Sequence, residues 1–219
     1  MRRWHSEPQP TAQPETQEPT LVKHADLRHY VRVYDAALEA GFCGQLIAQF
    51  ERASAQHSHN GAGARAGLDD SAWTELNVTR SADPAFQGFF IEQVRAALAR
   101  YNADLGLSAP VPWRPRLADL RIKRYRASAG ERFQPHFDAC DEETGRYLVL
   151  LWYLNDVAEG GQTRFVDLDL EVAPRSGRLL MFPPYWMYMH AGLPPRSGDK
   201  YILSTYLEFT AKPSPPPHG

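Results

Sequence analysis

Two histidines and one aspartate are the residues of this sequence best suited to hold a metal ion. His136 and Asp138 stand two positions apart in the segment Gln134–Asp138. Because alternate side chains of a β-strand point to the same face, such a pair can reach one ion from one strand. His190, which follows an aromatic run, supplies a third ligand. Two imidazoles and one carboxylate suit mononuclear iron(II) and leave three octahedral positions open, although zinc accepts the same ligands.

Lys200 is the second candidate for a chemical role, because it opens the apolar and aromatic run Tyr201–Leu207. An ammonium that points into a core needs a partner. The commoner alternative is a lysine that faces solvent at the start of a strand. The functional interpretation is that Lys200 binds the distal carboxylate of a dicarboxylic co-substrate, with Tyr125 and Thr163 as further hydrogen-bond donors. Both of these residues are also typical of ordinary strands.

The elements that must position these residues are mostly short strands. Asp35 is the predicted N-cap of a helix that runs to about Arg52, and Pro84 opens a second predicted helix that ends near Arg100. A flexible loop is predicted at 54–70. Short strands separated by turn residues predict a β-sandwich or barrel braced by the two helices. The predicted strands are 29–34, 73–79, 119–126, 132–137, 146–155, 162–166, 169–172, 178–182, 185–190 and 200–209.

Composition and charge restrict the class of protein. Hydrophobic residues make up 43% of the 219 residues and charged residues 23%, with a formal net charge of −2. This balance is typical of a globular protein and favours neither nucleic acid nor an anionic membrane as a partner. No apolar run approaches the roughly 20 residues that a membrane span requires. The two cysteines, Cys43 and Cys140, lack the spacing of a metal or redox motif, which indicates reduced thiols and a cytoplasmic location.

Both ends of the chain differ in composition from its middle. Residues 1–20 are rich in Pro, Gln, Glu and Thr, and 213–219 are mostly proline. Such segments bury too little apolar surface to offset the entropy of ordering, so two disordered tails are predicted. The remaining residues, 21–212, are expected to form one domain, with helical support at about 35–105 and a β-rich core at about 117–209.

Beyond the three candidate ligands, a series of short motifs in this sequence is similar to those of a known family. Residues Leu120 to Leu207 resemble the catalytic core of prolyl 4-hydroxylase-type 2-oxoglutarate oxygenases, with each block in the order and spacing of that family. The blocks are Arg124-Tyr125, Phe133–Asp138, Tyr153–Val157, Glu159–Phe165, Pro174–Arg178, His190 and Lys200.

This resemblance implies a double-stranded β-helix, the jelly roll shared with cupins, with the metal near its open end. It implies that His136, Asp138 and His190 hold catalytic iron(II), and that Lys200 binds 2-oxoglutarate. Tyr125, Thr163 and Tyr153 would assist Lys200. The implied enzyme is a dioxygenase that uses O2, with ascorbate in a supporting role, to hydroxylate an unactivated C–H bond of a peptidyl or free amino acid. Succinate and CO2 are the co-products.

Two alternatives remain open on the sequence. The same chemistry could act on a small natural-product scaffold by hydroxylation, desaturation or cyclisation, or the chain could be a non-catalytic metal-binding jelly-roll module. A buried Lys200 would favour the enzyme, because a simple metal site needs no cation there. The expected partner is a small-molecule, amino-acid or peptide substrate, with no nucleic acid and no membrane.

Further residues are weaker candidates. Trp186, Tyr188, Arg164 and Arg124 are predicted at the rim of the cavity, although packing aromatics and surface charges explain them equally well. The acidic loop Ala139–Arg146 is a less favoured candidate for a lid. The pair His57 and His59 lies in a Gly- and Ala-rich stretch and is expected to be exposed to solvent.

Overall fold

The computed structural model describes residues 26–64, 66–113, 116–140 and 145–209. The predicted tails at 1–20 and 213–219, and both predicted domain limits, lie outside these residues. Within the described part of the chain, no helix combines the length and the apolar character that crossing a membrane requires. The elements are η1 (Leu27–Tyr30), β1 (Arg32–Tyr34), α1 (Ala40–Arg52), η2 (Ser54–Gln56), β2 (Ser58–Gly61), β3 (Ala72–Asn77), α2 (Pro84–Leu105), β4 (Arg121–Tyr125), β5 (Phe133–His136), β6 (Arg146–Tyr153), β7 (Thr163–Phe165), β8 (Leu170–Val172), β9 (Leu179–Phe182), η4 (Trp186–Tyr188), β10 (His190–Gly192) and β11 (Lys200–Glu208).

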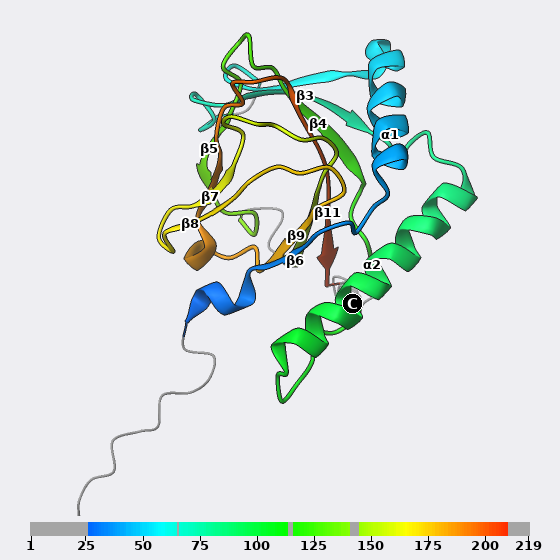
Figure 1. Cartoon of the computed structure of the whole chain (residues 1–219), viewed down its shortest axis with the longest axis vertical. Helices are drawn as coiled ribbons and strands as arrows, with labels where there is room; N and C mark the ends of the chain where they lie inside the picture. The colour runs from blue at the N-terminus through cyan, green and yellow to red at the C-terminus, as the bar shows by residue number, and fades with distance from the viewer. Residues whose placement is uncertain (1–25, 65, 114–115, 141–144, 210–219) are drawn as a thin grey trace, which may run out of the picture.

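Two antiparallel sheets make up the β-rich half of the molecule (Figure 1). The larger sheet has the strand order β1-β9-β6-β11-β4-β3-β2, and the smaller has the order β5-β10-β7-β8. Strands that are distant in sequence are neighbours in both sheets, as in a jelly roll. The predicted mainly β architecture, a double-stranded β-helix with supporting helices, is therefore confirmed.

The residues of strand β6 show that the centre of the large sheet is buried on both faces. Every residue from Tyr147 to Tyr153 is buried. Leu148, Leu150 and Trp152 belong to the apolar cluster shared with the helices, whereas Val149, Leu151 and Tyr153 belong to the cluster between the sheets. A strand covered on both faces is expected to be apolar throughout rather than alternating. This run places β6 at the centre of the fold.

Both helices lie on the same side of the large sheet, opposite β5, β7 and β8 (Figure 1). Asp83 caps α2 by accepting a hydrogen bond from the backbone N–H of Phe86 at 2.8 Å, and Pro84 occupies its first turn, as predicted. The predicted end at Arg100 is too early, because Tyr101 and Leu105 continue the buried stripe. Gly106, in the left-handed conformation at φ 58°, ends the helix.

The predicted start of α1 at Asp35 is wrong. The Asp35 carboxylate accepts hydrogen bonds from the guanidinium of Arg178, at 2.6 and 3.1 Å, and caps no helix. Ala36 adopts a φ of 53°, which a right-handed helix does not accommodate. The helix therefore begins at Ala40, and its predicted end at Arg52 is correct.

Three further predictions of local structure are wrong. Only Arg32–Tyr34 of the strand predicted at 29–34 is extended, because η1 precedes it. The loop predicted at 54–70 contains β2, which pairs with β3 at the edge of the large sheet. The strand predicted at 185–190 is the 3-10 helix η4, since the Tyr188 N–H bonds to the Tyr185 carbonyl at 2.8 Å. His190 thus begins a strand rather than ending one.

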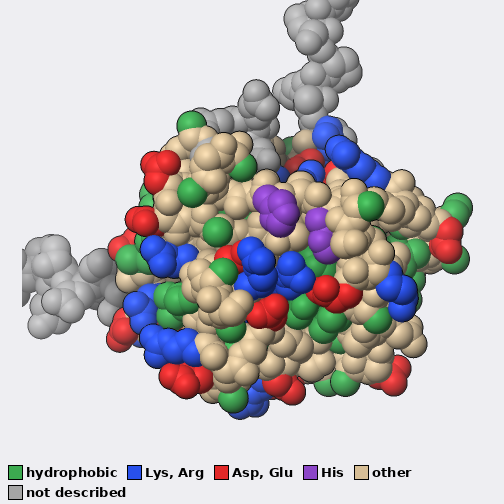
Figure 2. Space-filling view, turned by 90° about the horizontal axis from the view of Figure 1, so that it is seen from above, with side chains coloured by type: hydrophobic (Ala, Val, Ile, Leu, Met, Phe, Trp, Pro, Cys, Tyr) green, Lys and Arg blue, Asp and Glu red, His purple; other side chains and the backbone are tan. Residues whose placement is uncertain are grey.

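Charged side chains of opposite sign lie beside each other over the face that Figure 2 shows. Several of the described surface cations form ion pairs, including Arg28 with Asp26 at 2.7 Å and Arg196 with Glu159 at 3.4 Å. Exposed pairs of this kind contribute little to stability, on the order of 0–1 kcal/mol each. The charges that Figure 2 shows on this face have no single dominant sign.

Candidate metal centre

The three candidate ligands lie together between the two sheets. Their ligand atoms are all within 4.8 Å of one another. His136 ends β5 and Asp138 follows it by two residues, while His190 opens β10. The antiparallel pairing of β10 with β5 sets His190 directly opposite His136. This pairing brings His190 close to His136 and Asp138. The three residues had been predicted as one site from their types.

The hydrogen bonds of the imidazoles define which nitrogen faces the centre. Nδ1 of His136 lies 2.8 Å from the carbonyl oxygen of Gln134, and Nδ1 of His190 lies 3.0 Å from that of Tyr188. A carbonyl oxygen only accepts, so each Nδ1 is the protonated donor and each neutral ring keeps its lone pair on Nε2. The Nε2 atoms of His136 and His190 lie 3.8 and 3.5 Å from the carboxylate oxygens of Asp138.

Burial and charge favour the protonation states that a metal requires. Burial, with help from nearby His190, lowers the pKa of His136 to about 3, and burial also lowers the pKa of His190. Burial alone would raise the pKa of Asp138, but the histidines, Lys123 and Arg146 hold it below its ordinary value. Near neutral pH the site therefore contains two neutral imidazoles and one carboxylate.

The Asp138 carboxylate provides a direct test of whether a cation fits. Its Oδ1 accepts a hydrogen bond from the Tyr206 hydroxyl at 3.0 Å. Its buried Oδ2 has no hydrogen-bond partner among the described residues. This oxygen and two imidazole lone pairs converge on one point, an arrangement that is unfavourable unless a positive ion joins them. The donor set fits iron(II), and also zinc.

Lys200 lies at the closed end of the same interior space. Its side chain is only 2% exposed, and its Nζ donates to the carbonyl oxygen of Gly161 at 3.1 Å. The ammonium also stands 4.5 Å from the centre of the Tyr125 ring. No ion pair among the described residues includes Lys200. Burial, assisted by Lys123, lowers its pKa to about 7, so the site favours an incoming anion.

Two of the other three predicted co-substrate residues line this space with Lys200. Tyr125 and Thr163 are both buried and both face the cavity. Tyr153 does not line it, because its hydroxyl donates to Thr163 Oγ1 at 2.6 Å and lies 3.3 Å from the Val172 carbonyl oxygen. Tyr153 thus leaves the Thr163 hydroxyl proton free to point toward a ligand, since the Thr163 oxygen already accepts.

Two connected cavities meet at the candidate metal centre. The inner cavity is narrow, about 30 Å³, and the outer cavity measures about 290 Å³. The inner cavity is lined by Lys123, Tyr125, Phe133, His136, Asp138, Val149, Leu151, Thr163, Phe182, His190, Gly192, Lys200, Ile202, Ser204 and Tyr206. The outer cavity is lined by Asn60, Ala66, Leu68, Trp73, Glu75, Arg121, Lys123, Phe133, His136, Phe137, Asp138, Cys140, Arg146 and Tyr206.

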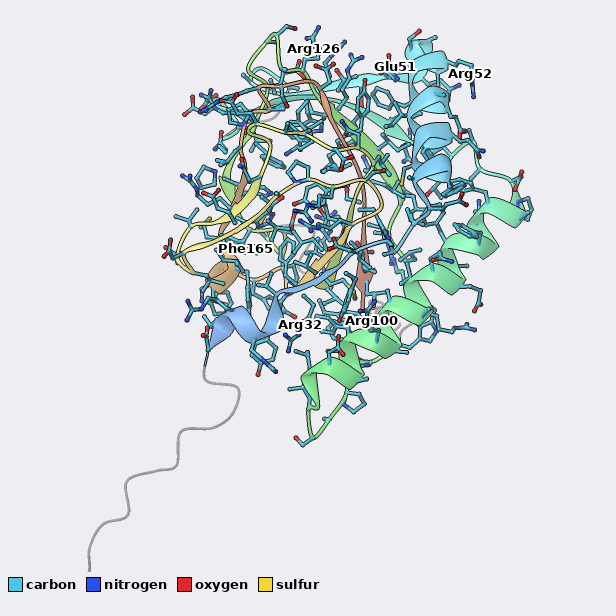
Figure 3. All side chains as sticks on the ribbon, viewed as in Figure 1. Arg32, Glu51, Arg52, Arg100, Arg126 and Phe165 are labelled. Carbon is cyan, nitrogen blue, oxygen red and sulfur yellow. The ribbon has the colours of Figure 1, made fainter. Side chains whose placement is uncertain are left out.

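None of the four residues predicted at the rim lines either cavity. Tyr188 is buried and donates to the Leu27 carbonyl oxygen, whereas Trp186 is 66% exposed. Arg164 pairs with Glu171 at 2.6 Å. Arg124 pairs with Glu51 of α1, on the outer side of the large sheet and away from Phe165 of the small sheet (Figure 3). The alternation assumed for 185–190 fails because that segment is not a strand.

Sequence reasoning missed Lys123, Arg121 and Tyr206, which line the cavities. The sequence did contain a signal for these residues, because alternate residues of a strand share a face. Strand β4 places Arg121, Lys123 and Tyr125 on one face, and β11 does the same for Lys200 and Tyr206.

The structure also shows where the weaker candidates lie. His57 is half-buried against Phe50, with ring centres 4.1 Å apart, so its predicted exposure is wrong, whereas His59 is exposed. Residues 141–144 of the predicted lid lie outside the described residues.

Part of the chain is similar to proteins of known families. The model of the 2OG-Fe(II) oxygenase superfamily matches residues 120–208. A protein of Acanthamoeba polyphaga mimivirus that bears the provisional name prolyl 4-hydroxylase is 30% identical over 108 residues, which is 41% of this chain and 44% of that protein. The chain thus spans less than half the length of this curated relative.

Solved structures show the same fold. A collagen prolyl hydroxylase of Paramecium Bursaria Chlorella virus-1, in complex with 2-oxoglutarate, superposes with a TM-score of 0.58 and 20% identity, covering 83% of this chain and 97% of that one. A prolyl hydroxylase of Trichoplax adhaerens, in complex with a hypoxia-inducible-factor peptide, gives a TM-score of 0.62 with 17% identity and coverages of 81% and 83%. At these low sequence identities, the similarity to the solved structures shows a shared fold and nothing more.

Proposed function

We propose that this chain is an iron(II)- and 2-oxoglutarate-dependent dioxygenase, because residues 120–208 match the model of the 2OG-Fe(II) oxygenase superfamily. It hydroxylates an unactivated C–H bond of a peptidyl or free amino acid. The observation that carries the proposal is the shared cavity of the triad and Lys200, a buried cation that no described acidic residue neutralises. The runner-up, a non-catalytic metal-binding module, gives no reason to bury that ammonium.

His136, Asp138 and His190 are the proposed iron ligands, and they occupy three positions of the ion. Iron(II) with 2-oxoglutarate would supply the oxidising chemistry, consuming O2 and releasing succinate and CO2. The hydrogen bonds from each Nδ1 to a carbonyl oxygen fix the two rings, and the Tyr206 hydroxyl fixes the carboxylate. Such supporting contacts orient ligands and strengthen their binding to metal.

Lys200 is the proposed partner for the distal carboxylate of 2-oxoglutarate. It can donate the two N–H bonds not used by the Gly161 carbonyl oxygen, and the Thr163 hydroxyl can add another. A buried ammonium and a carboxylate form a strong charge-assisted pair, which also offsets the cost of burying Lys200. The distal carboxylate of the co-substrate would then lie in the inner cavity, and the outer cavity would receive the substrate.

The peptide in the Trichoplax structure and the names of the other relatives favour an amino-acid residue as the target. The outer cavity, at about 290 Å³, is at the small end of ligand pockets, which span roughly 300–1,000 Å³. A single residue or a compound of similar size suits this volume. The same cavity would serve a small natural-product scaffold, which is the alternative substrate class.

The direct test is anaerobic titration of iron(II) and 2-oxoglutarate into the protein, followed by visible absorption. We expect the weak charge-transfer band of the chelate, and we expect His136→Ala to abolish it. His59→Ala, which changes an exposed histidine outside both cavities, is the matched control and should keep the band. A folded wild-type protein that binds the metal without producing the band would favour the non-catalytic module.

A further inference from the structure

The cavity-facing side of β4 connects the two cavities. Tyr125, Lys123 and Arg121 are alternate residues of this strand, so they point to the same face at intervals of about 6–7 Å. Tyr125 lines only the inner cavity, Arg121 only the outer one, and Lys123 both. The Lys123 ammonium therefore belongs to the junction where substrate and metal centre would meet.

The Lys123 ammonium lies near a stack of aromatic rings. The rings of Trp73 and Phe133 are stacked with centres 4.5 Å apart, and Phe133 stacks in turn on His136 at 3.6 Å. Lys123 Nζ lies 5.5 Å from the centre of Trp73 and 5.7 Å from that of Phe133. These rings hold the lysine along the cavity wall rather than in open solvent.

Besides Asp138, the one carboxylate among the described residues of the outer cavity is Glu75, and Glu75 is already engaged. Its Oε1 accepts from Arg121 at 2.6 Å, and its Oε2 accepts from the indole N–H of Trp73 at 3.2 Å. Arg146 lies against the Tyr206 ring and 3.7 Å from Glu208. Among the described residues, no ion pair within 4.0 Å includes Lys123. Lys123 thus lines both cavities without a described carboxylate in ion-pair contact with it.

We propose that Lys123 binds a carboxylate of the primary substrate, whose body lies against Trp73 and Phe133. This inference rests on the proposed function, because it assumes that the triad holds iron and that Lys200 holds 2-oxoglutarate. A carboxylate is favoured because one fixed cation with hydrogen-bond donors suits one acidic group, and because the limited volume suits a compact molecule. The acid could be a small carboxylic acid or an acidic side chain of a peptide.

Binding to the loaded protein tests the proposal without relying on turnover. Mn(II) and saturating 2-oxoglutarate should be present anaerobically, so that neither the metal nor Lys200 captures the probe. The first probe pair is N-benzoylglycine and its neutral amide, measured by calorimetry. The second pair is Ac-Ala-Glu-Ala-NH2 and Ac-Ala-Gln-Ala-NH2, which tells a small acid from an acidic side chain. We expect one acid to bind at least about tenfold more tightly than its amide.

Two variants of β4 form a matched pair, because each removes one positive charge from neighbouring positions on opposite faces. Lys123→Met should remove the preference for the acid, and Lys123→Arg should largely retain it. Arg124→Met, whose partner Glu51 lies on the outer side of the sheet, should leave the preference unchanged. Equal loss in both methionine variants would indicate a long-range charge effect and would overturn the assignment.

Three further outcomes would also contradict the proposal. Wild-type protein that binds Mn(II) and 2-oxoglutarate but discriminates no acid from its amide would show that Lys123 recognises no carboxylate. Lys123→Met protein with weakened affinity for 2-oxoglutarate and unchanged affinity for the acids would assign Lys123 to the co-substrate. Failure of wild-type protein to bind 2-oxoglutarate at all would instead refute the proposed function, and with it the premise of this inference.

Discussion

Lys200 and Lys123 project into the same interior from neighbouring strands, yet their surroundings differ. In the pairing of β11 with β4, Lys200 stands opposite Tyr125, and Lys123 stands opposite Ile202. Lys200 is almost completely buried with a carbonyl oxygen as its acceptor, whereas Lys123 is half-buried beside an open cavity and a nearby carboxylate. The cost of burying a charge makes Lys200 dependent on a bound anion.

The same contrast appears in the electrostatics. Burial lowers the pKa of Lys200 to about 7, and the positive charge of Lys123 contributes to that shift. The pKa of Glu75 is also lowered, but there the ionised form is stabilised: burial would raise this pKa, and Lys123 and Arg121 hold it below its ordinary value. Apart from Asp138, which lines both cavities, the described lining of the inner cavity has no carboxylate, whereas that of the outer cavity has Glu75. Under the proposed function, the structure would bind the two acids at different depths, the co-substrate in the inner cavity and the substrate in the outer one.

The largest expected effect is the loss of 2-oxoglutarate binding in Lys200→Met. Removing one partner of a buried charge pair costs about 2–5 kcal/mol, which corresponds to at least roughly 30-fold in affinity. Calorimetry with Mn(II) measures it, and Lys123→Met should change this affinity by less than about threefold. Equal losses in both variants would remove the distinction between the two lysines.

The next effect is the pH dependence of the free energy of unfolding without 2-oxoglutarate. Lys200 has a lowered pKa in the folded state, so between pH 7 and its ordinary value the unfolded chain binds the extra proton and stability rises with pH. Relative to Lys200→Met, the wild-type stability should rise by at most about 1.4 kcal/mol per pH unit from pH 7 to about 9.5. Urea unfolding at several pH values measures this difference. Identical curves for the two proteins would show that Lys200 keeps its ordinary pKa.

Glu75→Gln should strengthen binding of the carboxylate probe at the outer end. It removes the negative charge nearest to Lys123 while preserving the side-chain volume. A gain of about 1 kcal/mol, or roughly fivefold, is expected for a charge change at the edge of a cavity. Glu171→Gln, which changes the partner of Arg164 outside both cavities, is the control. Weaker binding in Glu75→Gln would mean that Glu75 positions Lys123 rather than competing with the substrate.

The smallest expected effect is that of Lys123→Met on stability. Lys123 is half-buried, and the substitution removes the contact of its ammonium with two aromatic rings, worth about 0.5–1 kcal/mol, while Arg121 still pairs with Glu75. Methionine retains most of the apolar contact, so the free energy of unfolding should change by less than about 1 kcal/mol. A larger loss, measured by urea unfolding, would make Lys123 a structural residue and weaken its assignment to substrate binding.

Several features were determined by the sequence itself because they depend on local physics. The His136-x-Asp138 spacing needs only the alternation of an extended chain, although Asp138 lies just past the end of β5. The apolar run at Tyr147–Tyr153 marked a strand buried on both faces, and Asp83 with Pro84 marked the start of α2. The segment before His190 misled the prediction, because its aromatic residues suit a strand and a 3-10 turn equally well.

Only the tertiary structure decided how these pieces meet. The pairing of β10 with β5 brings His190 to His136, and the facing sheets bury Lys200 away from any described acid. The junction role of Lys123 depends on Trp73 from β3 and Phe133 from β5, two segments that local sequence does not connect. Long-range strand pairing is selected by the packing of the whole core, so a local pattern can indicate the chemistry of each residue but not which residues share a cavity.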